Sequence, residues 1–154
     1  MLAWLNFVFL PVAARLCLVV LFPFSGIDKI IHWDDAMVQA KSTPVPFVGP
    51  LLVAAILVEL VTPFCIMFGW HDHLAAFVLA GFCVMTAVLY HQFWRFTDFW
   101  ARGESVARNH FWDFLKNFGL VGGLLLLIIA GALLPAQTVL QHPLASAPYE
   151  AQQD

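Results

Sequence analysis

Six polar side chains lie inside or at the ends of long apolar stretches of the sequence, where their types are suited to chemistry. They are Arg15, Lys29, Glu59, His91, Lys116 and Asn117. A charge inside a bilayer costs on the order of 3 kcal/mol on insertion scales, so such a residue is a functional candidate. A carboxylate there accepts or orients a proton beside a cation, whereas lysine, histidine and asparagine donate hydrogen bonds. We therefore predict Glu59 and Arg15 as catalytic residues, and the other four as ligand-binding residues.

The composition indicates a membrane protein. The chain has 154 residues, of which 62% are hydrophobic and 11% are charged, and its mean hydropathy is +0.84. A soluble globular domain has about 25% charged residues, so a water-soluble monomer is excluded. The net charge of -3 and the absence of a lysine or arginine run exclude nucleic-acid binding.

Four apolar blocks are long enough to cross a bilayer as helices, which takes about 20 residues each. They extend roughly over residues 2–31, 47–69, 74–96 and 111–134. The blocks predict an all-α, integral membrane four-helix bundle as one domain over residues 1–134. We expect the polar tail, residues 135–154, to be disordered. The short turn over residues 69–73 makes the second and third helices antiparallel neighbours.

The basic residues near the ends of the expected spans and in the loops predict an orientation. They gather at the end of the first span and in the two longer loops, at Lys29, Lys41, Arg95, Arg102 and Arg108. The positive-inside rule then places both longer loops in the cytoplasm and both termini on the extracytoplasmic side. All six tryptophans fall near the ends of the expected helices, as an interfacial aromatic belt requires.

Depth along the helices predicts which polar groups meet. At 1.5 Å per residue from the cytoplasmic end, Arg15 is about 24 Å deep and Glu59 about 18 Å deep. A long arginine side chain closes that gap, so we expect a deep Arg15–Glu59 ion pair. Lys29, His91 and Lys116 lie at about 3, 8 and 8 Å, in one shallow polar layer. Pro23 is expected to kink the first helix.

Each candidate also has a purely structural interpretation. An Arg15–Glu59 pair could simply fix the register of two helices. Lys29 could extend its ammonium group to the interface, and His91 could be a hydrogen-bonded interfacial residue. The spacing of Lys116 with two following glycines, at 119 and 123, favours close helix packing.

Cysteine and metal chemistry are disfavoured. Cys17, Cys65 and Cys83 lie within the expected spans and form no C-x-x-C pair, so we interpret them as core residues rather than a thiol redox site. His71 and His73 lie on the short turn without a third ligand, and no metal site is predicted there.

Motifs spread over about residues 12–130 resemble the DoxX family of small four-helix membrane proteins. The matching segments are Arg15, residues 24–29 (FSGIDK), residues 44–46 (PVP), Glu59, residues 67–69 (MFG) and residues 114–126 (FLKNFGLVGGLLL). The turn after Gly69 differs from the family pattern, because it carries Trp70 and His71 where a basic residue is usual.

The resemblance implies a bacterial inner-membrane protein that serves as a membrane anchor or as the quinone-side component of a redox system. A quinone is the implied cofactor, and the implied enzyme is a quinone-linked oxidoreductase of which this chain is a subunit. The implied partners are the lipid bilayer, a soluble or membrane oxidoreductase and further copies of the chain. Two alternatives stay open, a non-catalytic assembly factor and a small-solute or proton transporter. The apolar outer half of the fourth helix, residues 124–132, disfavours the transporter.

Overall fold

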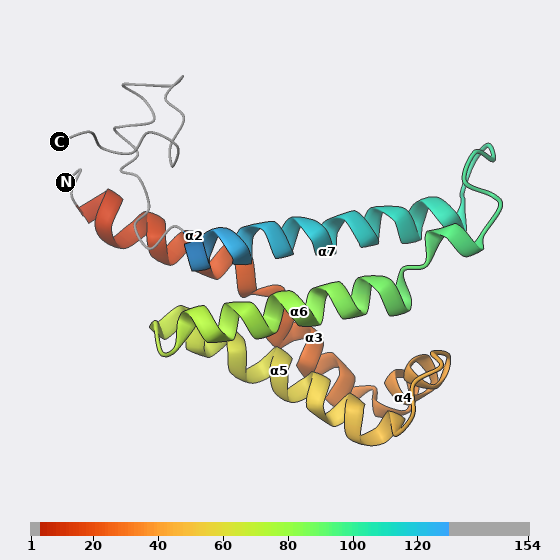
Figure 1. Cartoon of the computed structure of the whole chain (residues 1–154), viewed down its shortest axis with the longest axis horizontal. Coiled ribbons are helices and arrows are strands. Elements are labelled where there is room, and N and C mark those ends of the chain that lie inside the picture. Colours follow the sequence, from red (N-terminus) through yellow and green to blue (C-terminus); the bar gives the residue numbers. More distant parts are fainter. Residues whose placement is uncertain (1–3, 130–154) are drawn as a thin grey trace.

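The computed structural model describes residues 4–129, so the expected disordered tail lies outside the described residues. Within this range the chain is helical and contains no strand. The elements are η1 (Leu5–Phe9), α2 (Leu10–Val19), α3 (Leu21–Ile31), α4 (Trp33–Lys41), α5 (Val48–Phe68), α6 (Asp72–Tyr90), η2 (Phe93–Arg95) and α7 (Val106–Ile129) (Figure 1). Four stretches are long and apolar enough to cross a membrane: Leu10–Ile31, Val48–Phe68, Asp72–Arg95 and Val106–Ile129. The predicted all-α membrane fold with four spans is confirmed.

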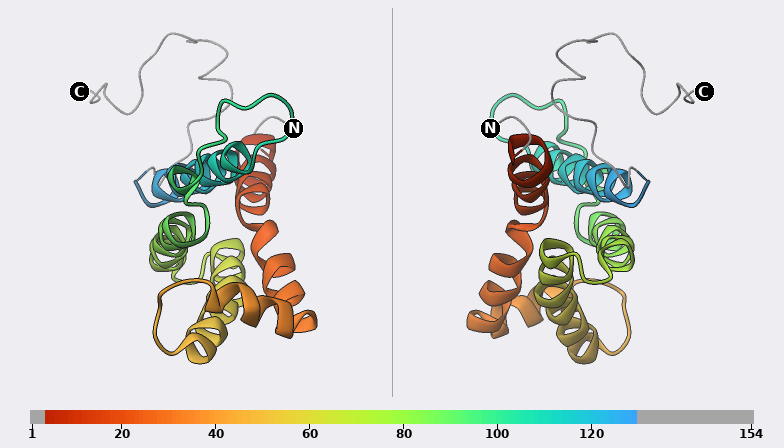
Figure 2. Two further views of the ribbon diagram at one scale, coloured as in Figure 1. Left: turned by 90° about the vertical axis from the view of Figure 1, so that its right-hand side faces the viewer. Right: turned by 90° about the vertical axis from the view of Figure 1, so that its left-hand side faces the viewer.

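The first span is broken at Val20, between α2 and α3. Pro23 has no N–H group to bond to the carbonyl of Val19, and this loss interrupts the hydrogen-bond ladder of the helix. Figure 2 shows α2 and α3 as two segments that run in different directions. The predicted kink is confirmed.

The four spans are arranged as a ring. In Figure 1, α6 lies between α7 and α5. The α2 segment contacts both α5 and α7, whereas α3 packs against α5. Gly123 permits the α2–α7 contact, because a Cβ atom there would lie 2.7 Å from Cδ1 of Leu18. The packing role predicted for the glycines holds at Gly123, whereas a Cβ atom at Gly119 would meet nothing within 4 Å.

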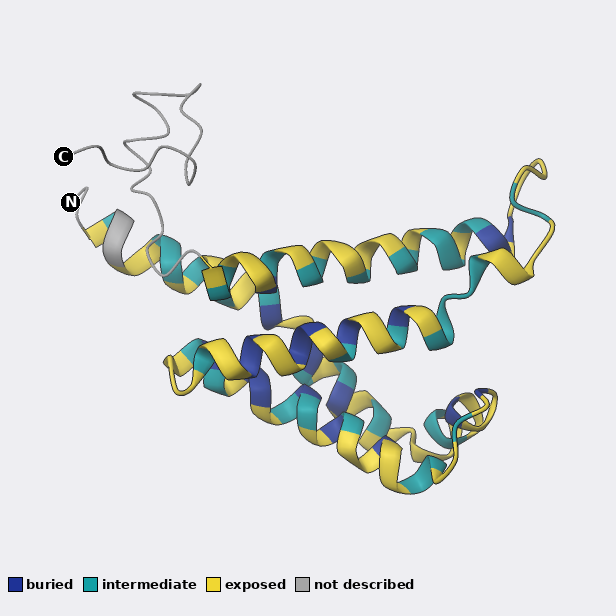
Figure 3. Cartoon of the chain, in the orientation of Figure 1, coloured by how far each residue is buried: buried dark blue, intermediate teal, exposed yellow. Residues whose placement is uncertain are grey.

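The buried core is small and lies where α2, α5, α6 and α7 meet. Its least exposed side chains include Val19, Ile66, Leu79, Cys83 and Leu124. Most large apolar residues are exposed instead. Figure 3 shows exposed positions along every span. A bilayer covers such surfaces with its acyl chains, so the exposure is that expected of a membrane protein.

The molecule has two distinct ends. At one end, Gly69 and His71 take positive φ angles of 68° and 48° and join α5 tightly to α6, and we call this the hairpin end. At the opposite end lie α4 and the segment 91–105, and we call this the loop end (Figure 1). The hairpin confirms that the second and third spans are antiparallel neighbours.

The fourth span begins five residues before the predicted boundary because polar groups cap α7. The Asp98 carboxylate accepts hydrogen bonds from the N–H groups of Val106 and Ala107, at 2.7 and 3.2 Å, and Ser105 Oγ accepts one from Arg108 at 3.1 Å. These bonds satisfy donors that have no partner inside the helix. Desolvation acts to raise the pKa of Asp98, but the hydrogen bonds from the N–H groups of Val106 and Ala107 outweigh it. The pKa therefore lies below its ordinary 3.8.

Candidate functional site

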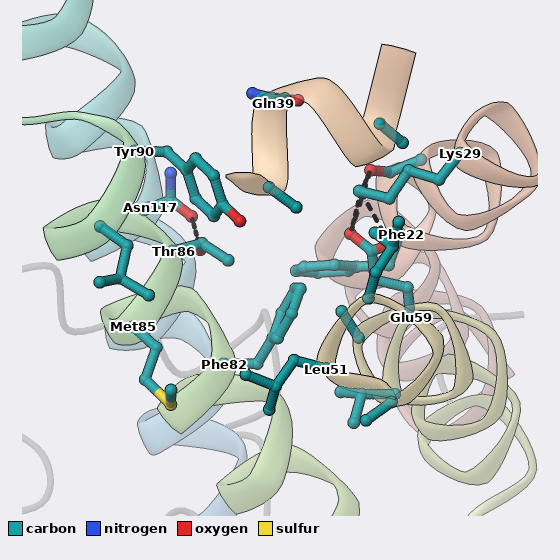
Figure 4. Close-up of a pocket in the computed structure, with 18 of the residues that line it drawn as sticks. Phe22, Lys29, Gln39, Leu51, Glu59, Phe82, Met85, Thr86, Tyr90 and Asn117 are labelled. Atoms are coloured by element: carbon teal, nitrogen blue, oxygen red, sulfur yellow. Dashed lines mark hydrogen bonds and ion pairs between the residues drawn. The ribbon is translucent and has the colours of Figure 1, made fainter. Parts of the chain in front are cut away.

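A cavity of about 980 Å³ lies in the loop-end half of the molecule, between α3, α4, α5, α6 and α7. Five of the six predicted site residues line it: Lys29, Glu59, His91, Lys116 and Asn117. Apolar side chains such as Phe22, Leu51, Phe82 and Met85 supply much of the remaining wall (Figure 4). The structure therefore brings the predicted polar residues around one space, in two clusters on opposite walls.

The first cluster joins α3 to α5. The ammonium group of Lys29 donates to both carboxylate oxygens of Glu59, at 2.7 and 2.8 Å, and to Ser25 Oγ at 2.6 Å. Ser25 in turn donates to Glu59 at 3.0 Å. Ser25 and Lys29 are four residues apart, so both lie on one face of α3. Glu59 is only 3% exposed, and the contacts neutralise and satisfy its carboxylate.

Gly26 sets the height at which α3 and α5 meet. A Cβ atom at Gly26 would lie 3.3 Å from Cβ of Glu59 and 3.1 Å from Cδ2 of Leu60, so the two backbones are close at this point. The last turn of α3 is therefore level with the middle of α5. This register brings Lys29 to Glu59.

The second cluster joins the end of α6 to α7. Asp113 accepts a hydrogen bond from Lys116 at 2.9 Å, and its other carboxylate oxygen lies 3.9 Å from Nδ1 of His91. Asn117 donates to the backbone carbonyl of Asp113 at 2.9 Å and accepts from Thr86 at 3.4 Å. Asp113 was missed from the sequence, although its i, i+3 spacing with Lys116 was a usable signal.

Two ring nitrogens in this region have no partner within residues 4–129. They are Nδ1 of His91 and Nδ1 of His110, and both atoms are buried. The two rings lie 5.9 Å apart, and His110 stacks on Phe96 with the ring planes 9° apart. The second cluster therefore retains free ring nitrogens, whereas the donor hydrogens of Ser25 and Lys29 in the first cluster are all in use.

Arg15 lies away from the cavity, at the hairpin end. Its guanidinium donates to the carbonyl of Ile66 at 2.6 Å and to the carboxylate of Asp72 at 2.7 Å. The Ile66 carbonyl is available because the N–H of Trp70 bonds to Cys65 instead. Arg15 thus ties α2 to the turn between α5 and α6.

The predicted Arg15–Glu59 ion pair is wrong, and so is the shallow position of Lys29. The depth count assumed a straight first helix whose end is level with the end of α5. The break at Val20 and the contact at Gly26 instead place Lys29 beside the middle of α5, so Lys29 is the partner of Glu59.

Within the described residues, no cluster of metal-ligating side chains is present, and all three cysteines are unpaired. Among residues 4–129, no group of three or more histidine, cysteine, aspartate or glutamate side chains could hold a metal ion. The three cysteines are free thiols, and none of them lines the cavity.

Comparisons with known proteins identify one family and two inner-membrane relatives. The DoxX family matches residues 10–92. The inner membrane protein YqjF of Escherichia coli (strain K12) is 32% identical over 118 residues, which cover 77% of this chain and 81% of the relative. The inner membrane protein YphA of the same organism is 27% identical over 118 residues, covering 77% and 80% of the two chains. No significant match to a solved structure was found. The chain, with four apolar spans and this match over more than half of its length, belongs to the DoxX family.

Proposed function

We propose that the chain is an inner-membrane component of a redox system, either its quinone-side subunit or its membrane anchor, and that the cavity receives a quinone head group. The cavity itself carries this proposal: a large, mostly apolar space among membrane spans, with polar groups on opposite walls. Sites for small organic ligands have this character, with an apolar lining and a few placed polar groups.

We base the proposed roles of individual residues on their contacts around the cavity. Glu59 orients or accepts a proton, and Lys29 holds its negative charge in place of Arg15. His91, Lys116 and Asn117 line the opposite wall of the cavity. Of these, His91 and Asn117 are the proposed donors to a ligand carbonyl, because Lys116 is engaged by Asp113. A bound quinone would accept hydrogen bonds through its two carbonyl oxygens.

Gly81 offers a direct test of the cavity. It lines the space, and a Cβ atom there would meet nothing within 4 Å, so Gly81→Leu adds a side chain to the cavity without a backbone clash. Gly122→Leu is the matched control, because Gly122 is equally open but lies on α7 away from the cavity. The measurement is the thermal unfolding of the full chain in mild detergent, with and without decylubiquinone.

The wild-type chain and Gly122→Leu are expected to gain about 2.7 kcal/mol of stability when the quinone is at 100 times its Kd. Gly81→Leu is expected to lose most of this gain. Equal stabilisation of all three proteins would show that the quinone binds elsewhere. No stabilisation of any of them would contradict the proposed ligand and favour a non-catalytic assembly factor.

We also propose that the loop end faces the cytoplasm, because Arg95, Arg102 and Arg108 lie there. A cysteine placed at Arg102, in a chain whose three native cysteines are replaced by alanine, is expected to react with a membrane-impermeant thiol reagent only in inside-out vesicles. A cysteine at His71 is expected to react only in right-side-out vesicles. The reverse pattern would refute the orientation.

A further inference from the structure

The cations at the cavity are already neutralised. An ammonium group has three donor hydrogens, and Lys29 has three acceptor atoms within 2.8 Å, the two oxygens of Glu59 and Ser25 Oγ. Lys29 therefore has no donor left for a ligand. Lys116 is paired with Asp113, and its side chain is 74% exposed rather than enclosed by the cavity.

The lining as a whole carries negative charge. It includes four carboxylates, on Asp28, Asp35, Glu59 and Asp113, but only two ammonium groups. The net charge is therefore -2 when the lining histidines are neutral, and it only reaches zero when His32 and His91 are both protonated. Glu59 and Asp113 are paired with lysines, so the uncompensated charge is that of Asp28 and Asp35 at the exposed rim, and an anionic head group that passes them meets repulsion.

Uncharged donors, in contrast, are unengaged. Tyr90, which is half-buried, and Gln39, which is exposed, both line the cavity, and within residues 4–129 neither the phenol hydroxyl nor the side-chain amide has a hydrogen-bond partner. They come from different elements, since Gln39 lies on α4 and Tyr90 is the last residue of α6. Figure 4 shows the Tyr90 hydroxyl directed into the space below Gln39.

We infer that the cavity selects an uncharged, carbonyl-bearing head group, held by Tyr90 and Gln39, and rejects lipids that carry a phosphate. This inference rests on the proposed function and adds the chemical class that the site accepts. Saturated ion pairs make the wall polar without attracting anions, whereas the phenol and amide donors suit neutral carbonyl oxygens. The membrane contains far more phospholipid than quinone, so rejection of phosphate keeps the site available.

The test compares two probes that share a decyl tail, decylubiquinone and decyl phosphate. Binding to the full chain in mild detergent is measured through the shift in thermal unfolding. Decylubiquinone is expected to bind at least tenfold more tightly than decyl phosphate. Tyr90→Phe and Gln39→Leu are each expected to weaken decylubiquinone binding about threefold to tenfold, the effect of one neutral hydrogen bond, and to leave decyl phosphate unchanged.

A charge variant tests the exclusion separately. The double variant Asp28→Asn/Asp35→Asn is expected to raise decyl phosphate affinity at least fivefold without changing decylubiquinone affinity. Asp34→Asn is the matched control, because Asp34 is adjacent on α4 but does not line the cavity.

The outcomes separate this inference from the proposed function. Equal binding of the two probes, both blocked by Gly81→Leu, would overturn the charge selection and leave quinone binding in place. An unchanged quinone affinity in Tyr90→Phe and Gln39→Leu would overturn the assigned donors. Binding of decylubiquinone that Gly81→Leu does not block would overturn the site itself, and with it both proposals.

Discussion

Replacing Glu59 with glutamine is expected to lower the free energy of unfolding by about 3 kcal/mol. The substitution leaves the Lys29 ammonium beside a neutral amide in a site where the Glu59 side chain is 4% exposed. Removing one member of a buried ion pair costs about 3–5 kcal/mol, because the remaining charge is uncompensated. Lys29 keeps 25% exposure, which allows partial hydration and places the cost at the lower end of that range.

The double variant Lys29→Met/Glu59→Gln should recover most of that loss, because no unpaired charge remains. The expected interaction energy in the double-mutant cycle is about 2 kcal/mol or more, the size found for residues in direct contact. Unfolding of the full chain in detergent, followed by tryptophan fluorescence, measures all four proteins. Lys116→Met is a suitable control, since the exposed pair of Lys116 and Asp113 is worth only about 0–1 kcal/mol.

Additive effects would refute this reasoning. If the two single losses sum to the double loss within about 0.5 kcal/mol, Lys29 and Glu59 do not interact. If Arg15→Met and Glu59→Gln are coupled instead, the originally predicted ion pair is the correct one.

Three further predictions follow from contacts outside the cavity. Arg15→Met should lower the free energy of unfolding by about 1–3 kcal/mol, because it leaves the Ile66 carbonyl and the Asp72 carboxylate without their donor. Thermal unfolding of Arg15→Met, Asp72→Asn and the double variant would show whether the two effects are coupled. Gly123→Leu should lower the melting temperature by separating α2 from α7, whereas Gly119→Leu, at an open position, should leave it nearly unchanged. The pKa of Asp98 is lowered in the folded chain, so its cap stabilises α7 above the ordinary pKa of 3.8 and this contribution disappears as the pH falls through the lowered value. The protection of amides in the first turn of α7, taken relative to their intrinsic exchange rates at each pH, should therefore fall in acid, and Asp98→Asn should reduce that pH dependence.

The sequence predicted the helices well because hydropathy and length are local properties. The second span was predicted as residues 47–69 and is Val48–Phe68, and the break near Pro23 was expected from its missing donor. The α4 helix was not predicted, because its nine residues are too few and too polar to resemble a span. Capping by Asp98, eight residues before Val106, required a loop conformation that no local pattern encodes.

The site was predicted as a set of residues but not as a set of contacts. Five of the six candidates line one cavity, because polar residues in apolar helices avoid lipid and face inward. Their pairing depends on the relative heights of two helices, which the contact at Gly26 determines and which counting from the helix ends misses. The acceptors of Arg15, the Ile66 carbonyl and Asp72, likewise belong to a turn whose geometry only the structure shows.

The ion pairs of Lys29 with Glu59 and of Arg15 with Asp72 also form in a fixed order during synthesis of the chain. Lys29 and Glu59 belong to the first two spans, so their charges neutralise each other as soon as this first helical hairpin has been synthesised. Arg15 depends on Asp72, at the start of the third span, and must wait for it. Each acidic partner is therefore synthesised after its cation, and the Arg15 contact with Asp72 forms later than the Lys29 contact with Glu59.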